Sequence, residues 1–300
     1  MITVAIPVKN GGALFVEVLE AVFAQEAELE VLVCDSGSAD GSPAAARARG
    51  ATVIEIAPEE FSHGGTRNLL MERAQGDRVA FLTQDAVPAS ARWLASLTGA
   101  LEGDVALACG AYVPRAEHSL PVRRELEAWF AELGTTTTID RLEPHERELE
   151  PWTLGPKRTF FTDANGAISK AAWREVPFRD VPYAEDRQLA VDMLRAGYAK
   201  AYVPEAAVVH SHDYPPRELL RRSFDEWRGL HETTGLVEPI GLNAFRGHVT
   251  SRVKLDVREG GGILTSVAHH GSRWIGALLG TRAHRLPAAV RRRLSLEDRP

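Results

Sequence analysis

The stretch that decides the fold is ITVAIPVKNGGALFVEVLEAVFAQEAELEVLVCDSGSADG, residues 2–41. It opens with a short β-branched run from Ile2 to Val8, passes through a glycine turn and continues with apolar residues at helical spacing. A second apolar run, Leu29 to Cys34, leads into a loop of small and acidic residues. A strand, a helix and a second strand in this order predict two parallel neighbours in one sheet.

The same alternation continues to about residue 110. We expect further strands at 52–56, 78–83 and 105–110, with helices between them. Near-continuous apolar strands separated by helices are typical of an α/β fold whose mostly parallel sheet is covered on both faces. Ligands of such sheets bind at the carboxyl ends of the strands, so we expect the loops after the strands to form the site.

Beyond residue 110 the rhythm changes. A polar stretch at 114–158 predicts an insert with helices, and order returns with an apolar segment at 160–169 and a helix from Glu185 to Ala196. From Pro215 onward the chain is expected to be helical and to end in an arginine-rich tail. The predicted domain therefore spans 1–214, with halves at 1–110 and 111–214, and a helical C-terminal extension with a basic tail spans 215–300.

Composition narrows the class of protein. The 300 residues are 44% hydrophobic and 25% charged, which is typical of a folded globular chain and excludes disordered and fibrous classes. The formal net charge of −6 argues against a general nucleic-acid binder. The first residues lack a signal-peptide pattern and no apolar run reaches bilayer-spanning length, so we expect a cytoplasmic protein. Cys34 and Cys109 lie in apolar runs and predict core residues rather than a disulfide.

The first candidate site residues lie in the turns that end the first two strands. They are Pro7, Val8, Asn10, Asp35, Ser36 and Gly37. An Asp at the end of the second strand can accept hydrogen bonds from a base or a ribose hydroxyl, and small residues after it let a ligand approach the backbone. The alternative is structural: Asp40 caps the next helix, while Gly37 and Gly41 only form the turn.

Together the two turns resemble the start of the inverting family 2 glycosyltransferases of the GT-A fold. Pro7-Val8-Lys9-Asn10 matches the family's Pro-x-x-Asn turn, and residues 35–41 match its Asp-x-x-Ser-x-Asp-Gly loop. The resemblance covers about residues 2–214. It implies a Rossmann-like GT-A fold in which the half at 1–110 binds a nucleotide diphosphate sugar and the half at 111–214 binds a hydroxyl acceptor.

Two further segments, EFSHGGTRN (60–68) and FLTQDAVP (81–88), resemble the rhamnosyltransferase branch of that family. Backbone N–H groups at a glycine-rich helix start, with a forked cation one turn later, suit a diphosphate, so Gly65 and Arg67 are donor-binding candidates, as are Gln84 and Asp85. The alternative is a glycine-rich turn with a surface arginine. Asp85 ends an apolar strand, where a divalent metal (Mg or Mn) bridging to phosphates is expected. The family's Asp-x-Asp is Thr83-Gln84-Asp85 here, so one carboxylate of the pattern is missing.

The second metal ligand is expected from VVHSH, residues 208–212. In the family this region supplies a histidine to the metal, and the resemblance assigns that role to His212. His210 is left to orient a neighbour or to pack in the core.

Acidic residues open the helix that starts at Glu185. Carboxylates in a first helical turn are stabilised by the helix dipole, which is a sufficient structural explanation. The pair Glu185-Asp186 also matches the family's Glu-Asp motif, in which the residue corresponding to Asp186 is the catalytic base. Glu185 is then an acceptor-binding candidate. Asp163 and Asn165 are two more, because the segment FFTDANGAI (160–168) resembles the family segment between donor and acceptor.

These matches predict an inverting, metal-assisted transfer of a sugar to a hydroxyl of a saccharide or lipid-linked acceptor. The resemblance favours dTDP-rhamnose as donor. Two alternatives stay open: a nucleotidyltransferase, for which residues 8–12 are a poor triphosphate loop, and a non-catalytic nucleotide-sugar binding protein, which the incomplete Thr83-Gln84-Asp85 motif favours. In the tail, arginines interleaved with Trp274, Leu278 and Leu286 predict either peripheral contact with an anionic membrane or a helix that packs on the body or forms a homo-oligomer.

Overall fold

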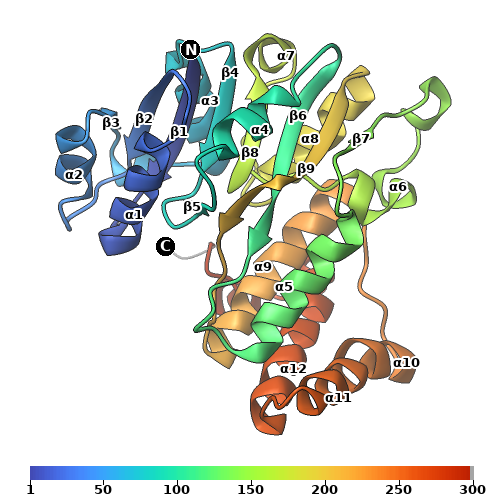
Figure 1. Ribbon diagram of the computed structural model, residues 1–300. Helices are drawn as coiled ribbons and strands as arrows, with labels where there is room; N and C mark the ends of the chain where they lie inside the picture. Colours follow the sequence, from blue (N-terminus) through green and yellow to red (C-terminus); the bar gives the residue numbers. More distant parts are fainter. Residues whose placement is uncertain (298–300) are drawn as a thin grey trace.

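The computed structural model describes residues 1–297 (Figure 1). Its centre is one sheet in the order β3-β2-β1-β4-β8-β6-β9-β5, with β7 also paired to β9. The strands are β1 (Ile2–Val8), β2 (Leu29–Asp35), β3 (Thr52–Glu55), β4 (Arg78–Leu82), β5 (Val87–Pro88), β6 (Val105–Val113), β7 (Thr138–Asp140), β8 (Asn165–Ser169) and β9 (Ala199–Val209).

The half formed by β3, β2, β1 and β4 is parallel throughout, as the alternation of strands and helices predicts. Its connecting helices are α1 (Gly12–Phe23), α2 (Ser42–Ala48) and α3 (His63–Arg73). In β1, Val4 and Ile6 face the core that α1 covers, whereas Ala5 faces the core that α3 covers. Both faces are therefore buried, which is why these strands are unbroken apolar runs in the sequence.

The other half of the sheet is mixed, so the prediction of mostly parallel strands holds only for the first half. β8 runs antiparallel to both of its neighbours, β4 and β6, while β5 and β7 are antiparallel to β9. After β6 the insert forms α5 (Leu120–Leu133) and α6 (Pro151–Arg158), which do not carry the chain back across the sheet. β8 therefore starts at the edge where β6 ends and runs the opposite way.

The remaining helices fall into two groups. α4 (Trp93–Gly99), α7 (Lys170–Glu175) and α8 (Glu185–Ala196) pack against the sheet. The extension consists of α9 (Pro216–Thr234), α10 (Leu242–Phe245), α11 (Ser251–Arg258), α12 (Ile263–Gly280) and α13 (Ala288–Leu294). Short 3-10 helices lie at Pro58–Glu60, Pro144–Glu146 and Ala283–Arg285, and a π-helix at Arg246–Thr250.

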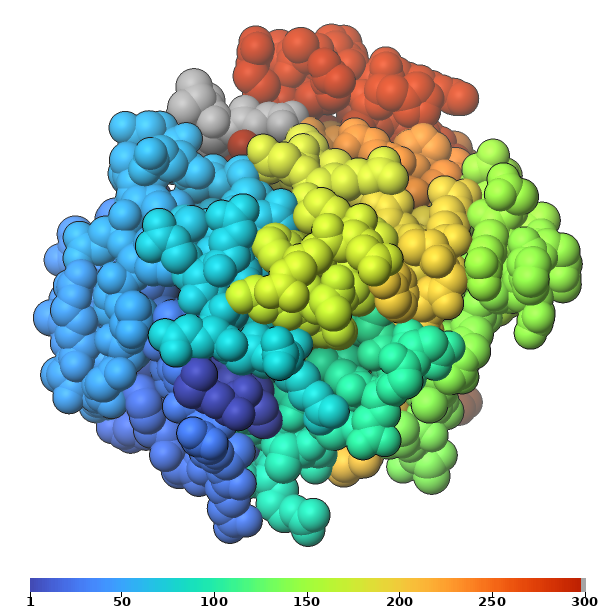
Figure 2. Space-filling model, turned by 90° about the horizontal axis from the view of Figure 1, so that it is seen from above, coloured from blue at the N-terminus to red at the C-terminus, as the bar shows by residue number. Residues whose placement is uncertain are grey.

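The helical extension lies beyond the carboxyl ends of the strands in Figure 1, and α9 and α12 run side by side there. Glycine permits this close packing: a Cβ on Gly276 would lie 2.5 Å from the carbonyl oxygen of Leu220, and one on Gly280 would overlap that of Phe224. Seen from the amino ends of the strands, the red C-terminal part of the chain lies along one edge of the molecule (Figure 2).

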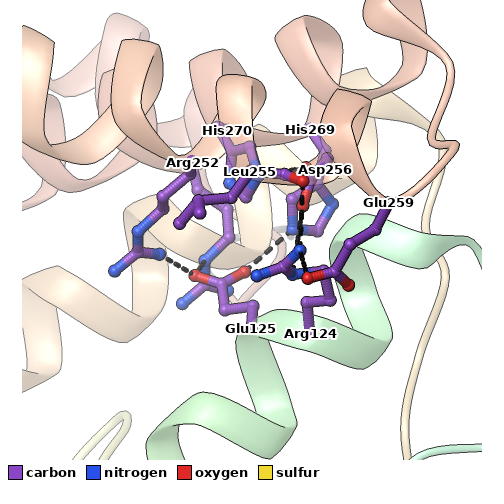
Figure 3. A network of polar contacts seen from close by, with 9 residues as sticks. Arg124, Glu125, Arg252, Leu255, Asp256, Glu259, His269 and His270 are labelled. Atoms are coloured by element: carbon purple, nitrogen blue, oxygen red, sulfur yellow. Dashed lines mark hydrogen bonds and ion pairs between the residues drawn. The ribbon is translucent and has the colours of Figure 1, made fainter.

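An ionic network ties α5 of the insert to the extension (Figure 3). The Glu125 carboxylate accepts from Arg252 at 2.7 Å, from His269 at 2.8 Å and from Arg273 at 3.0 Å. Although burial opposes ionisation, Arg273 and then His269 lower the pKa of Glu125 below its usual range. Glu125, His269 and His270 also bring metal-ligand atoms together, but two guanidinium groups on Glu125 oppose a further cation there. The network therefore holds helices rather than a metal.

Much of the arginine-rich tail is engaged with the body. Trp274 and Leu278 are half-buried on α12, Arg273 belongs to the network around Glu125, and Arg282 donates to the carbonyl of Glu238 at 2.9 Å. The interpretation of this segment as a helix packed on the body thus holds for α12. Among residues 1–297, no helix has the length and apolar character needed to cross a bilayer.

Candidate active site

The loop after β1 is tied to the loops after β2 and β4. The Lys9 amide donates to Gln84 Oε1 at 2.7 Å, and the Asn10 amide donates to Ser38 Oγ at 2.8 Å. In return, Asn10 Oδ1 accepts from the Ala39 amide at 2.8 Å. Asn10 itself has a left-handed φ of 52°, a conformation that Asn adopts more readily than most residues. The predicted donor-binding turns therefore meet at one edge of the sheet.

Asp35 ends β2 beside Pro7 and Val8 of β1. Its Oδ2 accepts the amides of Gly37 and the following residue at 3.1 and 3.0 Å, and the left-handed φ of 86° at Gly37 makes this tight turn. Ser36 Oγ donates to the Val8 carbonyl at 3.3 Å. Asp35 Oδ1, in contrast, is buried without a hydrogen-bond partner among residues 1–297. A buried carboxylate oxygen left unpaired is costly, so Asp35 fits the expected contact with a base or ribose.

Asp40 has a different place. It accepts from the Ser42 amide and hydroxyl at 3.0 and 2.7 Å and from the Gly12 amide at 2.8 Å. These hydrogen bonds, that of the Ser42 hydroxyl first, lower the pKa of Asp40. The geometry supports the structural interpretation of this residue, which fixes the start of α2.

Asp85, His210 and His212 converge from the ends of β4 and β9, and we call them the His–Asp cluster. Asp85 Oδ1 lies 3.5 Å from His210 Nδ1, and Asp85 Oδ2 lies 3.3 Å from His212 Nε2. Their ligand atoms all lie within 4.8 Å of one another. His210 Nδ1 is buried and has no hydrogen-bond partner in the part of the chain that the structure describes. One carboxylate and two imidazoles around a common point suit a divalent cation such as Mn²⁺.

Both imidazoles are held neutral. Burial lowers the pKa of His210, and burial followed by the neighbouring His210 lowers that of His212 to about 4. The ring of Tyr214 stacks on His212, with 5.0 Å between centroids, and the ring of Tyr112 meets His210 edge-on at 5.0 Å. Because a metal binds the neutral form of imidazole, the residues present fit a divalent cation.

A second cluster lies at the start of α8, and we call Arg67, Asp163, Glu185 and Asp186 the carboxylate cluster. The Arg67 guanidinium forms ion pairs with Asp163 through Nε and with Glu185 through Nη1, the latter at 3.0 Å. Ala184 turns the chain into α8 with a left-handed φ of 63°. This conformation costs a residue with a Cβ roughly 1–2 kcal/mol and is typical of functional sites.

The carboxylates of this cluster differ in their protonation. Burial raises the pKa of Asp163 well above its usual range. Burial and then the negative charge of Glu185 raise the pKa of Asp186 to about 6. For Glu185, burial is opposed by Arg67, which lowers its pKa. Glu185 is thus a fixed anion paired with Arg67, whereas Asp186 exchanges its proton close to neutral pH, as a general base must.

Tyr112 joins the two clusters. One side of its ring meets His210, and its hydroxyl forms a hydrogen bond with Thr162 Oγ1, next to Asp163. Burial first, and then the charges of Asp186 and Asp163, raise the pKa of Tyr112. The His–Asp cluster and the carboxylate cluster therefore lie near one aromatic ring, with His210 at one end of Tyr112 and the segment of Asp163 at the other.

Known proteins are similar to this chain over most of its length. Residues 3–174 match the family model described as glycosyl transferase family 2. The chain belongs to this family. This glycosyltransferase is 32% identical over 232 residues to the O-antigen chain rhamnosyltransferase RfbN of Salmonella typhimurium, a match that covers 75% of the chain and 70% of that protein. Its identity to the O-antigen chain rhamnosyltransferase WbaN of Salmonella anatum is 32% over 201 residues, covering 65% and 61%.

Solved structures share the fold of this glycosyltransferase. The mannosyltransferase PcManGT from Pyrobaculum calidifontis, in complex with GDP-Man and Mn²⁺, has a TM-score of 0.61 at 17% identity and covers 93% of this chain and 86% of that one. Glucosyl-3-phosphoglycerate synthase from Mycobacterium tuberculosis, in complex with Mn²⁺, UDP and phosphoglyceric acid, has a TM-score of 0.53 at 23% identity, with 81% of each chain covered. The GT-A-like α/β fold that the sequence predicts is confirmed.

Asn165, which the sequence predicts to contact the acceptor of this glycosyltransferase, lies in the core. Asn165 is fully buried; its Oδ1 accepts from Trp93 Nε1 at 2.8 Å, and its Nδ2 donates to the carbonyls of Ala111 at 3.1 Å and Ala206 at 2.8 Å. These bonds hold β8 to its surroundings. The expected contact with an acceptor is therefore wrong, because both ends of the amide are used inside the core.

Arg67 also differs from expectation. The sequence predicts a forked cation that faces a diphosphate, but the guanidinium is buried, contacts Asp163 and is paired with the ionised Glu185. The Gly65 amide is likewise occupied, since it donates to Ser62 Oγ at 3.2 Å. In this structure the start of α3 supports the carboxylate cluster.

Sequence reasoning missed Arg115, which lies beside the His–Asp cluster. Its Nη2 donates to the Asp85 carbonyl at 3.1 Å, and its amide donates to Ser211 Oγ at 2.9 Å. The sequence predicts a strand that stops at Gly110, whereas β6 continues to Val113 and brings Arg115 to the edge of the sheet where Asp85 lies.

Glu297, in the segment after α13, also lies near the carboxylate cluster. His63 Nε2 lies 3.6 Å from Glu297 Oε2, and His63 Nδ1 lies 3.9 Å from Glu185 Oε1. The Leu296 amide is fixed by Asp225 Oδ2 at 2.6 Å, which holds this last segment in place. No local pattern around residue 297 predicts the contact, because it depends on how the whole extension packs.

Proposed function

We propose that this glycosyltransferase transfers L-rhamnose from dTDP-rhamnose to a hydroxyl of a saccharide or lipid-linked acceptor, with inversion. The two curated relatives at 32% identity are rhamnosyltransferases, which supports the choice of sugar. The observation that carries the proposal is the placement of the His–Asp cluster and the carboxylate cluster on either side of Tyr112. This arrangement supports a site in which a metal-assisted leaving group and a proton acceptor act on the same donor sugar.

The donor side is formed by the loops after β1, β2 and β4. The nucleoside lies over the first two loops, where Asp35 Oδ1 accepts a hydrogen bond from the base or ribose. Asp85, His210 and His212 would hold Mg²⁺ or Mn²⁺, which neutralises charge on the leaving diphosphate. Arg115 adds a fixed positive charge next to Asp85.

On the acceptor side, Asp186 removes the proton of the attacking hydroxyl as that oxygen bonds to the anomeric carbon. The diphosphate leaves with the electrons of the broken C–O bond, and displacement from the opposite face inverts the centre. A pKa of about 6 leaves Asp186 ionised at neutral pH and ready to act as the base. Glu185, kept ionised by Arg67, can accept a hydrogen bond from a second hydroxyl of the acceptor.

Nucleotide release tests the proposal. The chain is incubated with dTDP-rhamnose, UDP-glucose or GDP-mannose, with Mn²⁺ or with EDTA, and with and without saccharide acceptors. We expect dTDP release from dTDP-rhamnose to be fastest and to fall with EDTA. Preferential turnover of another donor would contradict the choice of sugar. Pyrophosphate as product would indicate a nucleotidyltransferase, and tight binding without any release would indicate a non-catalytic binding protein.

A further inference from the structure

The apolar side chains with the largest exposed fractions gather at one end of the molecule. Among residues 1–297, the four most exposed are Leu264 (82%), Ile240 (70%), Leu242 (62%) and Ile263 (60%). Other exposed apolar residues of the same segment are Phe245, Leu255, Val257 and Val267. We call residues 240–267 the apolar tip; it comprises α10, α11 and the start of α12, at the lower end of the molecule in Figure 1.

Packing within the protein does not explain why these apolar side chains lie at the surface. On α11, Val253 and Asp256 are buried against the body, which fixes the inward face of the helix. Lys254, Leu255 and Arg258 lie on the other side at helical spacing and are exposed. Several exposed apolar side chains on helices that contact one another are typical of an interaction site rather than of a folding core.

The apolar tip carries a net positive charge, although the net charge of the whole chain is negative. It contains Arg246, Arg252, Lys254 and Arg258 against Asp256 and Glu259, a formal charge of +2 in a chain of −6. Asp256 is buried and bonded to His270, and Glu259 is paired with Arg124. Within the described residues, no carboxylate forms an ion pair with the three exposed cations Arg246, Lys254 and Arg258.

Apolar residues interleaved with unpaired cations match an anionic bilayer surface, where side chains enter the headgroup region and cations meet lipid phosphates. A second copy of the chain is a poorer match, because a symmetric contact would place like charges opposite each other. The carboxyl ends of the strands face the same side of the molecule as the extension (Figure 1).

We propose that the apolar tip docks this enzyme on the surface of an anionic phospholipid bilayer. Ile240, Leu242, Ile263 and Leu264 enter the interface, and the exposed cations contact lipid phosphates. Docking turns the catalytic edge of the sheet toward the membrane. The surface is separate from the His–Asp and carboxylate clusters, so this inference goes beyond the proposed function and does not depend on the sugar transferred.

Vesicle flotation tests docking, with vesicles that contain phosphatidylglycerol and with vesicles of phosphatidylcholine alone. One variant combines Ile263→Ser with Leu264→Ser, and a second combines Lys254→Ser with Arg258→Ser. The matched controls are Ile139→Ser, an exposed apolar residue on β7, and Arg292→Ser in the arginine tail. Donor hydrolysis without vesicles is measured for every variant, so that loss of docking is distinguished from loss of catalysis.

We expect the parent to float with anionic vesicles and not with neutral ones, and its binding to weaken as salt is added. The apolar variant should bind about ten- to a hundredfold more weakly, and the cation variant should lose most of the preference for anionic lipid. Both controls should bind like the parent, and all variants should keep donor hydrolysis.

Equal flotation of the parent and the apolar variant overturns the proposal, as does equal binding to both kinds of vesicle. Loss of binding in Arg292→Ser instead would assign the contact to the tail. A concentration-dependent dimer in sedimentation velocity that Leu264→Ser abolishes, without vesicle binding by the parent, would show that the tip is a self-association surface.

Discussion

Changing Asp186 to asparagine should stabilise the enzyme while it removes activity. The pKa of Asp186 is raised from 3.8 to about 6 by burial and by Glu185. At about 1.4 kcal/mol per unit, a shift of this size corresponds to about 1–3 kcal/mol. The sign follows from linkage: a raised carboxyl pKa stabilises the fold below pH 3.8, and this contribution is lost as the pH rises through about 6. At pH 7.5 the ionised Asp186 therefore destabilises the folded state, and asparagine removes that cost.

The neighbouring residue provides the matched control. Glu185 is ion-paired with Arg67 at 3.0 Å, and its pKa is lowered rather than raised. Glu185→Gln removes a charge that compensates a buried guanidinium, so it should destabilise the fold by roughly 3 kcal/mol. Two isosteric changes at adjacent positions are thus expected to move the free energy of unfolding in opposite directions.

Thermal unfolding by circular dichroism at pH 7.5 and pH 4.5 measures the stability, and nucleotide release with acceptor measures the rate. Asp186→Asn should melt a few degrees above the parent at pH 7.5, with the difference shrinking at pH 4.5, and should lose roughly a hundred- to ten-thousandfold in rate. If Asp186→Asn retains more than about a tenth of the parental rate while Glu185→Gln is inactive, the roles of the two carboxylates are reversed. If Asp186→Asn lowers the melting temperature at pH 7.5, the electrostatic reasoning is wrong.

Three further outcomes follow from the same geometry. In a pH profile, kcat/KM should fall about tenfold per unit below pH 6, where Asp186 takes up a proton, and a profile without a break near pH 6 would contradict its role as the base. Mn²⁺ with dTDP should raise the melting temperature of the parent, and His210→Ala should lose the metal-dependent part of that rise, whereas His145→Ala, an exposed histidine of the segment Pro144–Glu146, should keep it. Asn165→Leu should cost about 2–4 kcal/mol in urea unfolding, because it leaves buried partners such as Trp93 Nε1 unpaired, and a neutral result would show that these bonds are not important for stability.

The sequence predicts best where structure is local. The run from Ile2 to Val8 becomes β1, and the helix expected from Glu185 to Ala196 has those bounds in α8. Both depend on hydrophobic period and on nearby stop signals such as Gly197. The direction of β8 could not be read in this way, since it depends on where the insert returns the chain to the sheet.

The residues of the site also divide into those that local patterns predict and those that depend on distant parts of the chain. Asp85 and His212 lie together as the family resemblance implies, because β5, which follows Asp85, pairs with the end of β9 just before His212. Arg67 is paired with Glu185, far along the chain, and no local pattern indicates this contact. The same holds for the hydrogen bond between Asn165 and Trp93. The difference between Glu185 and Asp186 also depends on which of them meets Arg67.

The contact between His63 and Glu297 joins parts of the chain that are far apart in the sequence. Because Asp225 on α9 holds the Leu296 amide next to Glu297, the surroundings of His63 are complete only when the helical extension is packed in place. A shortened protein that lacks the extension would therefore leave His63, which lies 3.9 Å from Glu185, without the carboxylate of Glu297 beside it.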